Sequence, residues 1–442
     1  MKASYYNVTV ELEQGETLLY NTYWQSMATL DKDEAEAYEA LKSGEPDEGF
    51  TAFYDELAEK RFLVDDPERE ADWLEYEFER YKYNNEMFEL IVCPTIDCNF
   101  RCPYCYEKKR PGRMDEQTQD ALLAFVQESY DEQPFQKMRV TWYGGEPLLE
   151  QQIIERLSRG FLDFCDSHGI DYHAALMTNG SLASEDAMRR MEACGVKSVQ
   201  VTFGGKGKVH DCERPEIHGK STFDTIYSNV CRMMDEGKTL HVEYVFDRDN
   251  IDSCLEVVDD LAGNGNVYTH FPYPKMDYNN DFTDADGNEK FNLQTPRERA
   301  ESYRDIILRS RPTLGQWRQF MRPIHHYCGC SYDRFFVIDE LGNAYKCICD
   351  VDKPDTHRLF NINEPAETRS INWKMMSYYM DDNPLNSPTC RSCKVFPLCN
   401  GYCYIDRDAD RFWVPVRCHP IKMVIDDFVA AYYHSMQEAQ QA

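Results

Sequence analysis

The chain has 442 residues, 42% of them hydrophobic, and a formal net charge of -30 at pH 7. This length predicts two or three domains rather than one core. So negative a surface repels nucleic-acid phosphates and anionic membranes, which argues against both as partners. The sequence has no run of about 18 uncharged apolar residues and no apolar signal segment at its start. It therefore predicts a soluble, cytoplasmic protein.

The segment ahead of residue 86 predicts a small unit in which strands come first and helices follow. Tyr6, Val8 and Val10 share one face of an alternating pattern, which predicts a strand. Phe53 and Leu57 recur at helical spacing, which predicts a helix. The expected elements are strands at 5–12, 18–30 (a strand pair, or a strand and a turn) and 62–64, helices at 33–42 and 50–61, and a charged, aromatic-rich helix or linker at 74–87.

Beyond residue 87 apolar strands and amphipathic helices take turns along the chain. This alternation predicts a parallel α/β sheet, either curled into a barrel or wound on both sides. Ligands of such sheets bind at the carboxyl ends of the strands. The expected strands are 88–93, 138–142, 172–177, 199–203, 240–245 and 267–271, separated by helices such as 116–130, 152–168 and 185–194.

Three cysteines, Cys98, Cys102 and Cys105, follow the first of these strands with three and then two residues between them. Thiolates hold iron-sulfur clusters, and four of them normally complete a 4Fe-4S cube. A run that stops at three would leave one iron open for a small ligand, which implies chemistry at that iron. Buried structural thiols, or zinc ligands completed by a distant histidine, are the alternatives.

Glycine-rich and polar motifs follow the next two strands. Gly144, Gly145 and Glu146 come after the second strand. Paired glycines let the backbone approach a ligand closely, and the carboxylate can bind an ammonium group; a simple tight turn is the alternative. Thr178 and Asn179 follow the third strand, and their short side chains can meet hydroxyl groups.

A second cysteine zone holds nine cysteines between residues 328 and 418. An acidic loop at 277–289 and a helix at 296–309 are expected to precede it. Within the zone, the apolar stretches 335–338 and 344–347 flank a turn with Gly342, which predicts a hairpin. Disulfides are rare in a reducing compartment, so the short spacings predict metal binding. Zinc is the alternative to an iron-sulfur cluster here. The final run consists of Cys390, Cys393, Cys399, Cys403 and Cys418.

From Cys98 onward the sequence resembles the radical S-adenosylmethionine enzymes, and the second cysteine zone resembles their auxiliary-cluster extension, the SPASM domain. The resemblance implies an α/β fold with a partial (β/α)6 TIM-like barrel. It also implies a small N-terminal winged-helix-like α+β domain that recognises a peptide, for which a purely structural cap is the alternative. The implied domains are 1–85 for peptide recognition, 86–275 for the barrel, 276–325 for a linker and 326–442 for the SPASM domain with a C-terminal helix.

The resemblance further implies three [4Fe-4S] clusters and S-adenosyl-L-methionine. The triad would hold the first cluster, whose open iron binds the methionine amino and carboxylate groups before reductive cleavage to a 5'-deoxyadenosyl radical. Tyr104 occupies the adenine position, with a packed core tyrosine as the alternative. The other implied cofactor contacts are Gly144, Gly145 and Glu146 at the methionine amino group and Thr178 and Asn179 at the ribose.

The resemblance divides the later cysteines between two auxiliary clusters. The outer cluster would be held by Cys390, Cys393, Cys399 and Cys418. The inner cluster would be held by Cys347 and Cys403, with Cys328 and Cys330 as the remaining candidates and Cys349 as a further one. Whether one iron of the inner cluster stays open is not decided by the sequence.

One position departs from the family pattern. Peptide-modifying relatives usually carry an aspartate where this chain has Gly204. The loss of that carboxylate puts in doubt any role of this position toward cofactor or substrate. His210, Asp211 and Arg214 keep the family spacing, and a loop-fixing hydrogen-bond network is the alternative to a catalytic role.

The function that the resemblance implies is maturation of a ribosomally made precursor peptide. A hydrogen atom would be abstracted from the peptide and an oxidative crosslink formed, with a cysteine thioether as the expected product. A flavodoxin or ferredoxin is the implied electron donor. The alternatives are an anaerobic sulfatase-maturing enzyme, which generates formylglycine, and a non-catalytic iron-sulfur or zinc module that binds peptides.

Overall fold

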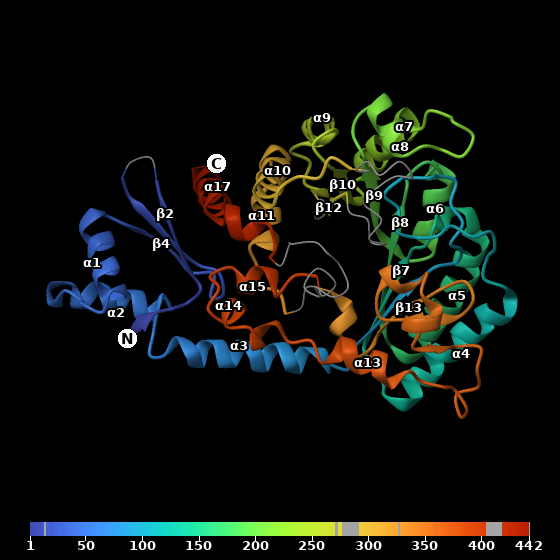
Figure 1. The fold of residues 1–442 in the computed structure, drawn as a ribbon, viewed down its shortest axis with the longest axis horizontal. Helices are drawn as coiled ribbons and strands as arrows, with labels where there is room; N and C mark the ends of the chain where they lie inside the picture. The colour runs from blue at the N-terminus through green and yellow to red at the C-terminus, as the bar shows by residue number, and fades with distance from the viewer. Residues whose placement is uncertain (13–14, 270–272, 276–290, 326–327, 404–417, 442) are drawn as a thin grey trace. The chain divides into compact units, whose positions relative to one another are not determined.

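A computed structural model describes residues 1–12, 15–269, 273–275, 291–325, 328–403 and 418–441. The chain forms two compact units (Figure 1). The first unit combines residues 1–82, 295–328 and 383–442, and the second combines residues 83–294 and 329–382. Within the described ranges, no helix is both long and apolar enough to cross a bilayer. The acidic loop expected at 277–289 lies outside the described residues.

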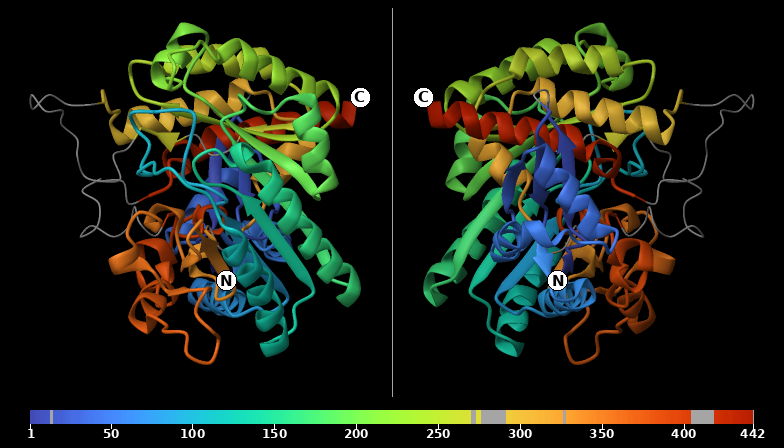
Figure 2. Two further views of the ribbon diagram at one scale, coloured as in Figure 1. Left: turned by 90° about the vertical axis from the view of Figure 1, so that its right-hand side faces the viewer. Right: turned by 90° about the vertical axis from the view of Figure 1, so that its left-hand side faces the viewer.

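A ten-stranded sheet forms the centre of the second unit (Figures 1 and 2). Its larger part is parallel, with sequential strands side by side in the order β11-β10-β9-β8-β7-β6. These strands correspond to the six expected from the sequence, and they confirm a parallel α/β sheet. Their bounds are β6 Met87–Val92, β7 Lys137–Trp142, β8 Asp171–Thr178, β9 Val196–Phe203, β10 Thr239–Phe246 and β11 Val267–Thr269, and β12 Tyr273–Pro274 pairs with β10.

Helices connect the parallel strands and bury one apolar face each. Asp115 and Ser184 begin two of them by accepting a hydrogen bond from a backbone N–H of the first turn, which satisfies a donor that the helix leaves free. Buried side chains recur at helical spacing along the longer ones, as the sequence pattern predicts. The helices and turns are α4 Glu116–Glu132, η2 Pro147–Glu150, α5 Gln151–His168, α6 Glu185–Ala193, α7 Lys208–Glu213, α8 Phe223–Asp235 and α9 Ile251–Leu261.

The expected hairpin at residues 335–347 exists, but it extends the sheet rather than standing apart. Strand β13 (Phe335–Ile338) lies parallel to β6, and Cys93 N donates to the Ile338 carbonyl (2.8 Å). Strands β14 (Asn343–Tyr345) and β15 (Phe360–Asn361) continue the sheet in antiparallel fashion. The remaining elements of this part are η3 Gly329–Ser331, η4 Ile348–Asp350, α12 Pro354–His357 and α13 Trp373–Met380.

The first unit begins with an antiparallel sheet in the order β2-β3-β4, as the expected strand pattern suggested. Leu19 of this sheet packs with Tyr38, Leu57 and Phe62 in one apolar core. A long helix begins earlier than the expected start at residue 74, because Asp66 accepts a hydrogen bond from Glu68 N and caps it. The elements are β1 Lys2–Ala3, β2 Asn7–Glu11, β3 Thr17–Asn21, β4 Met27–Leu30, α1 Lys32–Lys42, η1 Glu48–Phe50, α2 Thr51–Glu59, β5 Leu63–Val64 and α3 Pro67–Lys82.

The later segments of the first unit are mainly helical. The C-terminal helix α17 packs against α10, α11 and β2. Tyr20 of β3 donates to the Met321 carbonyl (3.1 Å), and its ring meets the Tyr432 ring edge to face. The bounds are α10 Pro296–Arg309, α11 Leu314–Phe320, η5 Pro384–Asn386, α14 Pro388–Arg391, α15 Phe396–Cys399 and α17 Ile421–Gln441.

The segment that leads into β13 is held by one buried side chain, that of Lys346. Lys346 is 0% exposed and donates to the carbonyls of Tyr332 (2.5 Å), Asp333 (2.8 Å) and Phe335 (3.0 Å). We expect Lys346→Met to lower the free energy of unfolding by roughly 2–4 kcal/mol, because three buried carbonyls lose their partner. Urea unfolding followed by circular dichroism checks this. The matched control Lys374→Met, at an exposed position of α13, should stay within about 0.5 kcal/mol of the unchanged protein; equal effects of both changes would contradict the assignment.

Candidate active site and auxiliary cysteine site

The loop that follows β6 carries the three predicted cluster ligands, Cys98, Cys102 and Cys105. Cys105 N donates to the Cys102 carbonyl (3.1 Å), so these two residues close a tight turn. Arg101 N donates to the Pro215 carbonyl (2.8 Å), which ties the middle of the loop to the segment after α7. The triad therefore sits at the carboxyl end of the sheet, where a parallel α/β fold binds its ligands.

A buried ion pair that the sequence did not reveal lies beside two of these thiols. Lys109 forms a short ion pair with Glu107, which is 6% exposed. Burial raises the pKa of the Cys98 thiol to about 12, whereas the Lys109 charge lowers it. Burial likewise raises the pKa of Cys105, and Lys109 again opposes the rise. The lysine thus favours the thiolate form, which is the form that binds iron.

The Gly144–Gly145 pair packs directly on the loop that leads to the triad. Gly145 N donates to the Thr95 carbonyl (3.1 Å), and Glu146 N donates to the Asp97 carbonyl (2.9 Å). A β-carbon at Gly145 would lie 1.9 Å from the Asp97 carbonyl oxygen, and one at Gly144 would lie 2.3 Å from that of Thr95. Gly144 also has a φ of 114°. Glycine is needed here because two backbones touch, and not only to admit a ligand.

Glu146 joins two of the predicted cofactor segments to each other. It is 0% exposed, and its carboxylate accepts from Thr178 Oγ1 (2.8 Å), Asn179 N (2.8 Å) and Leu148 N (3.0 Å). The Asn179 side-chain amide lies 4.0 Å from the Cys98 sulfur. Burial raises the pKa of Glu146, while these hydrogen bonds lower it. The carboxylate therefore holds the ends of β7 and β8 together beside the triad.

Two buried polar atoms next to the triad lack a hydrogen-bond partner among the described residues: Tyr104 Oη and Arg214 Nε. The Arg214 guanidinium lies over the Phe100 ring (5.6 Å) and donates a short hydrogen bond to the Thr202 carbonyl. Burial lowers the pKa of Arg214, but interactions with Tyr104 and Cys102 raise it overall. A fixed cation and an unused hydroxyl beside three thiols fit a site that takes a polar ligand.

Gly204 fits closely against its surroundings. A β-carbon at this position would lie 3.0 Å from the Glu213 β-carbon. The aspartate that relatives carry here would therefore require Glu213 to move.

The groups after Gly204 form the loop-fixing network that was the alternative to catalysis. Burial lowers the pKa of His210 to about 3, so the imidazole is neutral, and its ring lies between Phe203 and Phe223 (5.6 and 5.7 Å). The Asp211 carboxylate accepts from Ser221 Oγ (2.6 Å) and from Phe223 N (3.0 Å). Both contacts hold the turn ahead of α8.

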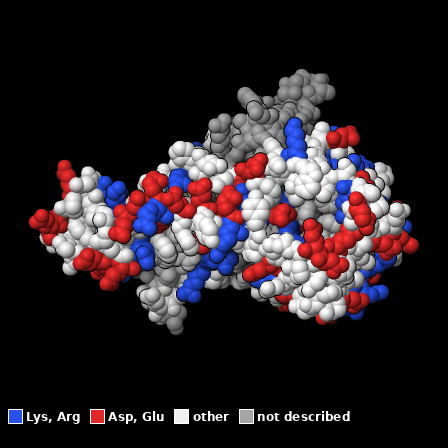
Figure 3. Space-filling model, turned by 90° about the horizontal axis from the view of Figure 1, so that it is seen from below, with Lys and Arg blue, Asp and Glu red and all other residues white. Residues whose placement is uncertain are grey.

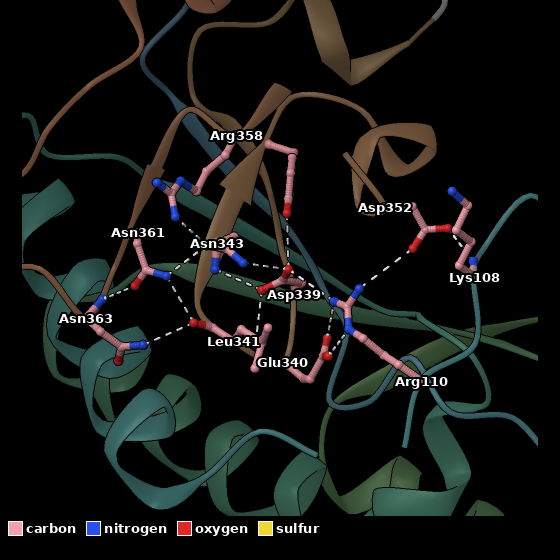
Figure 4. Close-up of polar contacts among 11 residues, drawn as sticks. Lys108, Arg110, Asp339, Glu340, Leu341, Asn343, Asp352, Arg358, Asn361 and Asn363 are labelled. Carbon is pink, nitrogen blue, oxygen red and sulfur yellow. Dashed lines mark hydrogen bonds and ion pairs between the residues drawn. The ribbon is translucent and has the colours of Figure 1, made fainter. Parts of the chain in front are cut away.

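The end of the triad loop is fixed to the β13–β14 hairpin by Arg110 (Figure 4). Its guanidinium donates to both oxygens of Glu340 (2.5 and 3.0 Å) and to Asp339 (3.4 Å), and it forms an ion pair with Asp352 (3.7 Å). Lys108 N donates a short hydrogen bond to Asp352 as well. Asp339 and Glu340 are 0% and 3% exposed, so these charges are screened little by water.

The hairpin side of this contact is itself held by amide side chains (Figure 4). Asp339 accepts from Asn343 N (2.8 Å) and Asn343 Nδ2 (3.0 Å). Asn361 and Asn363 each donate to the Leu341 carbonyl (3.1 Å). The turn that meets Arg110 is therefore preorganised.

The four cysteines predicted for the outer cluster come together in the first unit. Cys390, Cys393, Cys399 and Cys418 line one small cavity of ≈ 20 Å³. Burial raises the pKa of Cys399 to about 12, and the three neighbouring thiols add to the rise. Lys422 Nζ lies 3.9 Å from the Cys418 sulfur. Four thiols around one space have the composition that an iron-sulfur cube needs.

Zinc remains the alternative metal for these cysteines, since four thiolates suit it as well. Within the described residues, no group of three or more His, Cys, Asp or Glu side chains is arranged to hold one metal ion.

The cysteines predicted for the inner cluster belong to different parts of the chain. Cys330 and Cys347 are buried in the second unit, where Cys349 also lies. Cys328 and Cys403 belong to the first unit. Their assignment to one cluster stays a prediction.

The chain is similar to known proteins over the region just described. Residues 92–261 match the family model of the Radical SAM superfamily. A curated relative is the cysteine-type anaerobic sulfatase-maturating enzyme of Clostridium novyi (strain NT), 21% identical over 343 residues, which cover 71% of this chain and 87% of that protein.

Solved structures with the same fold include the enzyme anSMEcpe with bound AdoMet (TM-score 0.57, 16% identity). That match covers 80% of this chain and 99% of anSMEcpe. Streptococcus suis SuiB matches at a TM-score of 0.50 and 15% identity, over 95% of this chain and 100% of SuiB. At these identities the likeness shows a shared fold.

The glycine pair provides a direct test of the site. We expect Gly145→Ala to weaken binding of S-adenosylmethionine at least about tenfold, because the new methyl group forces the two backbones apart. Equilibrium dialysis with radiolabelled cofactor measures this. Gly315→Ala is the matched control, since its β-carbon would have only Thr313 Oγ1 within reach, at 3.9 Å. Unchanged affinity of the Gly145 variant would show that the contact does not shape the site.

Proposed function

Residues 92–261 make this chain a radical SAM superfamily enzyme, and on that premise we propose that it modifies a peptide. The proposed reaction removes a hydrogen atom from a precursor peptide and leaves an oxidative crosslink, with a cysteine thioether as the expected product. The observation that carries the peptide part is an open strand edge beside a groove lined by both apolar and charged residues, in the unit that also holds the outer cysteines.

At the first site the proposed ligands of the cluster are Cys98, Cys102 and Cys105. When reduced, a cluster held there would supply the electron that cleaves S-adenosylmethionine to methionine and the radical that takes the hydrogen atom. The protein residues hold and orient the cofactor. Tyr104 and Arg214 offer buried polar atoms that need a partner, and Glu146 keeps the surrounding strand ends aligned.

We propose two auxiliary clusters in addition, which gives three in all. The outer one uses the four cysteines around the cavity of the first unit, Cys390, Cys393, Cys399 and Cys418. Such sites require a reducing compartment, and the cytoplasm is the proposed location.

The proposed peptide site lies along β4. Among the described residues, β4 pairs only with β3, so its other edge is free to accept an extended peptide as a further strand. A groove of ≈ 380 Å³ runs beside it. Side chains of β4, α1, α2 and α17 line this groove: Met27, Ala28, Thr29, Leu30, Glu34, Phe53, Glu56, Leu57, Lys60, Tyr433 and Met436. The mixture of an apolar floor with charged residues fits a peptide.

The peptide proposal agrees with what is known of proteins that share the fold. One structure of anSMEcpe contains AdoMet together with a peptide, and it matches this chain at a TM-score of 0.57 with 17% identity. On the face shown in Figure 3, acidic side chains lie among the basic ones. With a net charge of -30, a positively charged or neutral peptide is a better partner than nucleic acid.

A second candidate function is formylglycine formation, which the similarity to the sulfatase-maturating enzyme favours. The two reactions leave different masses on the peptide. A thioether forms with loss of two hydrogen atoms and keeps the sulfur, whereas formylglycine formation from cysteine replaces the sulfur with oxygen. Mass spectrometry of the precursor peptide after anaerobic co-expression distinguishes them.

Catalysis itself is tested at the triad. We expect Cys102→Ala to abolish release of 5'-deoxyadenosine from S-adenosylmethionine in the presence of dithionite, because two thiolates cannot hold the cluster. Chromatography of the nucleoside gives the measurement. Cys231→Ala, which removes a partly buried thiol of α8, serves as the control and should retain release. Release by the Cys102 variant would refute the triad as the ligands of the cluster. If the unchanged protein releases no nucleoside, the non-catalytic peptide-binding module is favoured instead.

The groove is tested separately. We expect Met436→Asp to weaken binding of the precursor peptide by about ten- to a hundredfold, because a carboxylate would be placed against the apolar part of the groove. Fluorescence anisotropy with labelled peptide measures the affinity. Gln440→Asp adds the same charge at an exposed position of α17 and should change binding little. If both variants bind as the unchanged protein does, the peptide site lies elsewhere.

A further inference from the structure

The segment that carries the first three outer cysteines packs on the N-terminal part of the first unit. Tyr6, Leu74, Phe78, Leu385 and Phe396 form one buried apolar cluster. Cys390 and Cys393 pack against this cluster, both partly buried. The N-terminal residues thus pack against the segment that lines the outer cysteine cavity.

Arg391, the neighbour of Cys390, is bound by three carboxylates of α3. Its guanidinium meets Glu68 (3.1 Å), Glu75 (2.7 Å) and, at short distance, Asp72. The three acids recur at helical spacing, so a single face of α3 presents them together. Exposed ion pairs contribute little one by one, but the Arg391 side chain is only 22% exposed and makes three contacts at once. This arrangement fixes the orientation of the arginine and of the backbone next to Cys390.

Two buried hydroxyl groups hold the backbone on either side of Cys393. Tyr6 Oη donates to the Arg391 carbonyl (3.3 Å). Thr22 Oγ1, on a residue that is 0% exposed, donates to the Lys394 carbonyl (2.6 Å). Both donors come from residues more than 350 positions earlier in the sequence. The N-terminal residues therefore supply hydrogen-bond donors to two backbone carbonyls of the cysteine segment.

We infer that Arg391, together with Thr22 and Tyr6, positions the outer auxiliary cluster, so that the N-terminal residues are a structural part of that cluster's site. The inference rests on the outer cluster of the proposed function. It assigns residues 1–82 a role in addition to peptide recognition. Arg391 acts through Cys390 and Cys393 and does not itself touch the proposed cluster, so it is a positioning residue.

The test uses the full-length, anaerobically reconstituted protein and its Arg391→Ala variant. We expect the iron that depends on Cys393 to be lost to a chelator about tenfold faster in this variant, because charge-assisted hydrogen bonds to the segment are gone. We also expect the electron paramagnetic resonance signal of the reduced outer cluster to change. That signal is the one that the Cys393→Ala variant lacks. Arg391→Lys should restore the signal only in part, since an ammonium cannot bind three carboxylates in the same fixed geometry.

Two further variants keep the outcome independent of a folding defect. Thr22→Val removes one hydroxyl at nearly constant volume and should shift chelation and signal in the same direction by less. Arg69→Ala removes an exposed arginine from α3 and should behave as the unchanged protein. Chelation and signal equal to the unchanged protein in both Arg391→Ala and Thr22→Val would overturn the inference. If the unchanged protein has no iron that depends on Cys393, the outer cluster of the proposed function fails and the inference with it, while nucleoside release would still report on the triad.

Discussion

The candidate active site depends on a contact between two backbones. The Gly144–Gly145 turn after β7 lies so close to residues 95–97 after β6 that a side chain at Gly145 would overlap a carbonyl oxygen. This contact brings the ends of two strands together and aims Glu146 at the segment after β8. The buried carboxylate then binds that third strand end by hydrogen bonds. Three of the parallel strands are thus fixed at the edge where the cysteine triad lies.

Much of this arrangement could be predicted from the sequence because it repeats. Strands buried on one face alternate with amphipathic helices, so the six parallel strands and their order along the chain follow from the residue pattern. The motif residues could be placed for the same reason, since each follows a strand end. The gathering of the four outer cysteines was predictable only through resemblance, and the cavity that they line in the structure is consistent with it.

Other features escaped prediction because they depend on pairs of residues far apart in the sequence. The apolar residues of β13 indicate a strand, but they do not indicate that it adds to β6, because the edge of any sheet offers the same backbone groups. The tie between Arg110 and Glu340 and that between Arg391 and α3 involve charged residues of a kind that usually face water. In a chain with 78 acidic residues, the sequence alone cannot single out the few carboxylates that face an arginine.

The division of the chain into two units has a consequence for truncation and proteolysis. Three stretches build one unit and two build the other, in alternation, so the polypeptide passes from one to the other four times. A fragment that ends at one of the first three passages lacks pieces of both units, and one that ends at residue 382 lacks the last stretch of the first unit. Neither unit corresponds to one uninterrupted stretch of the sequence. A single protease nick at a passage should likewise leave fragments that stay associated until a denaturant is added.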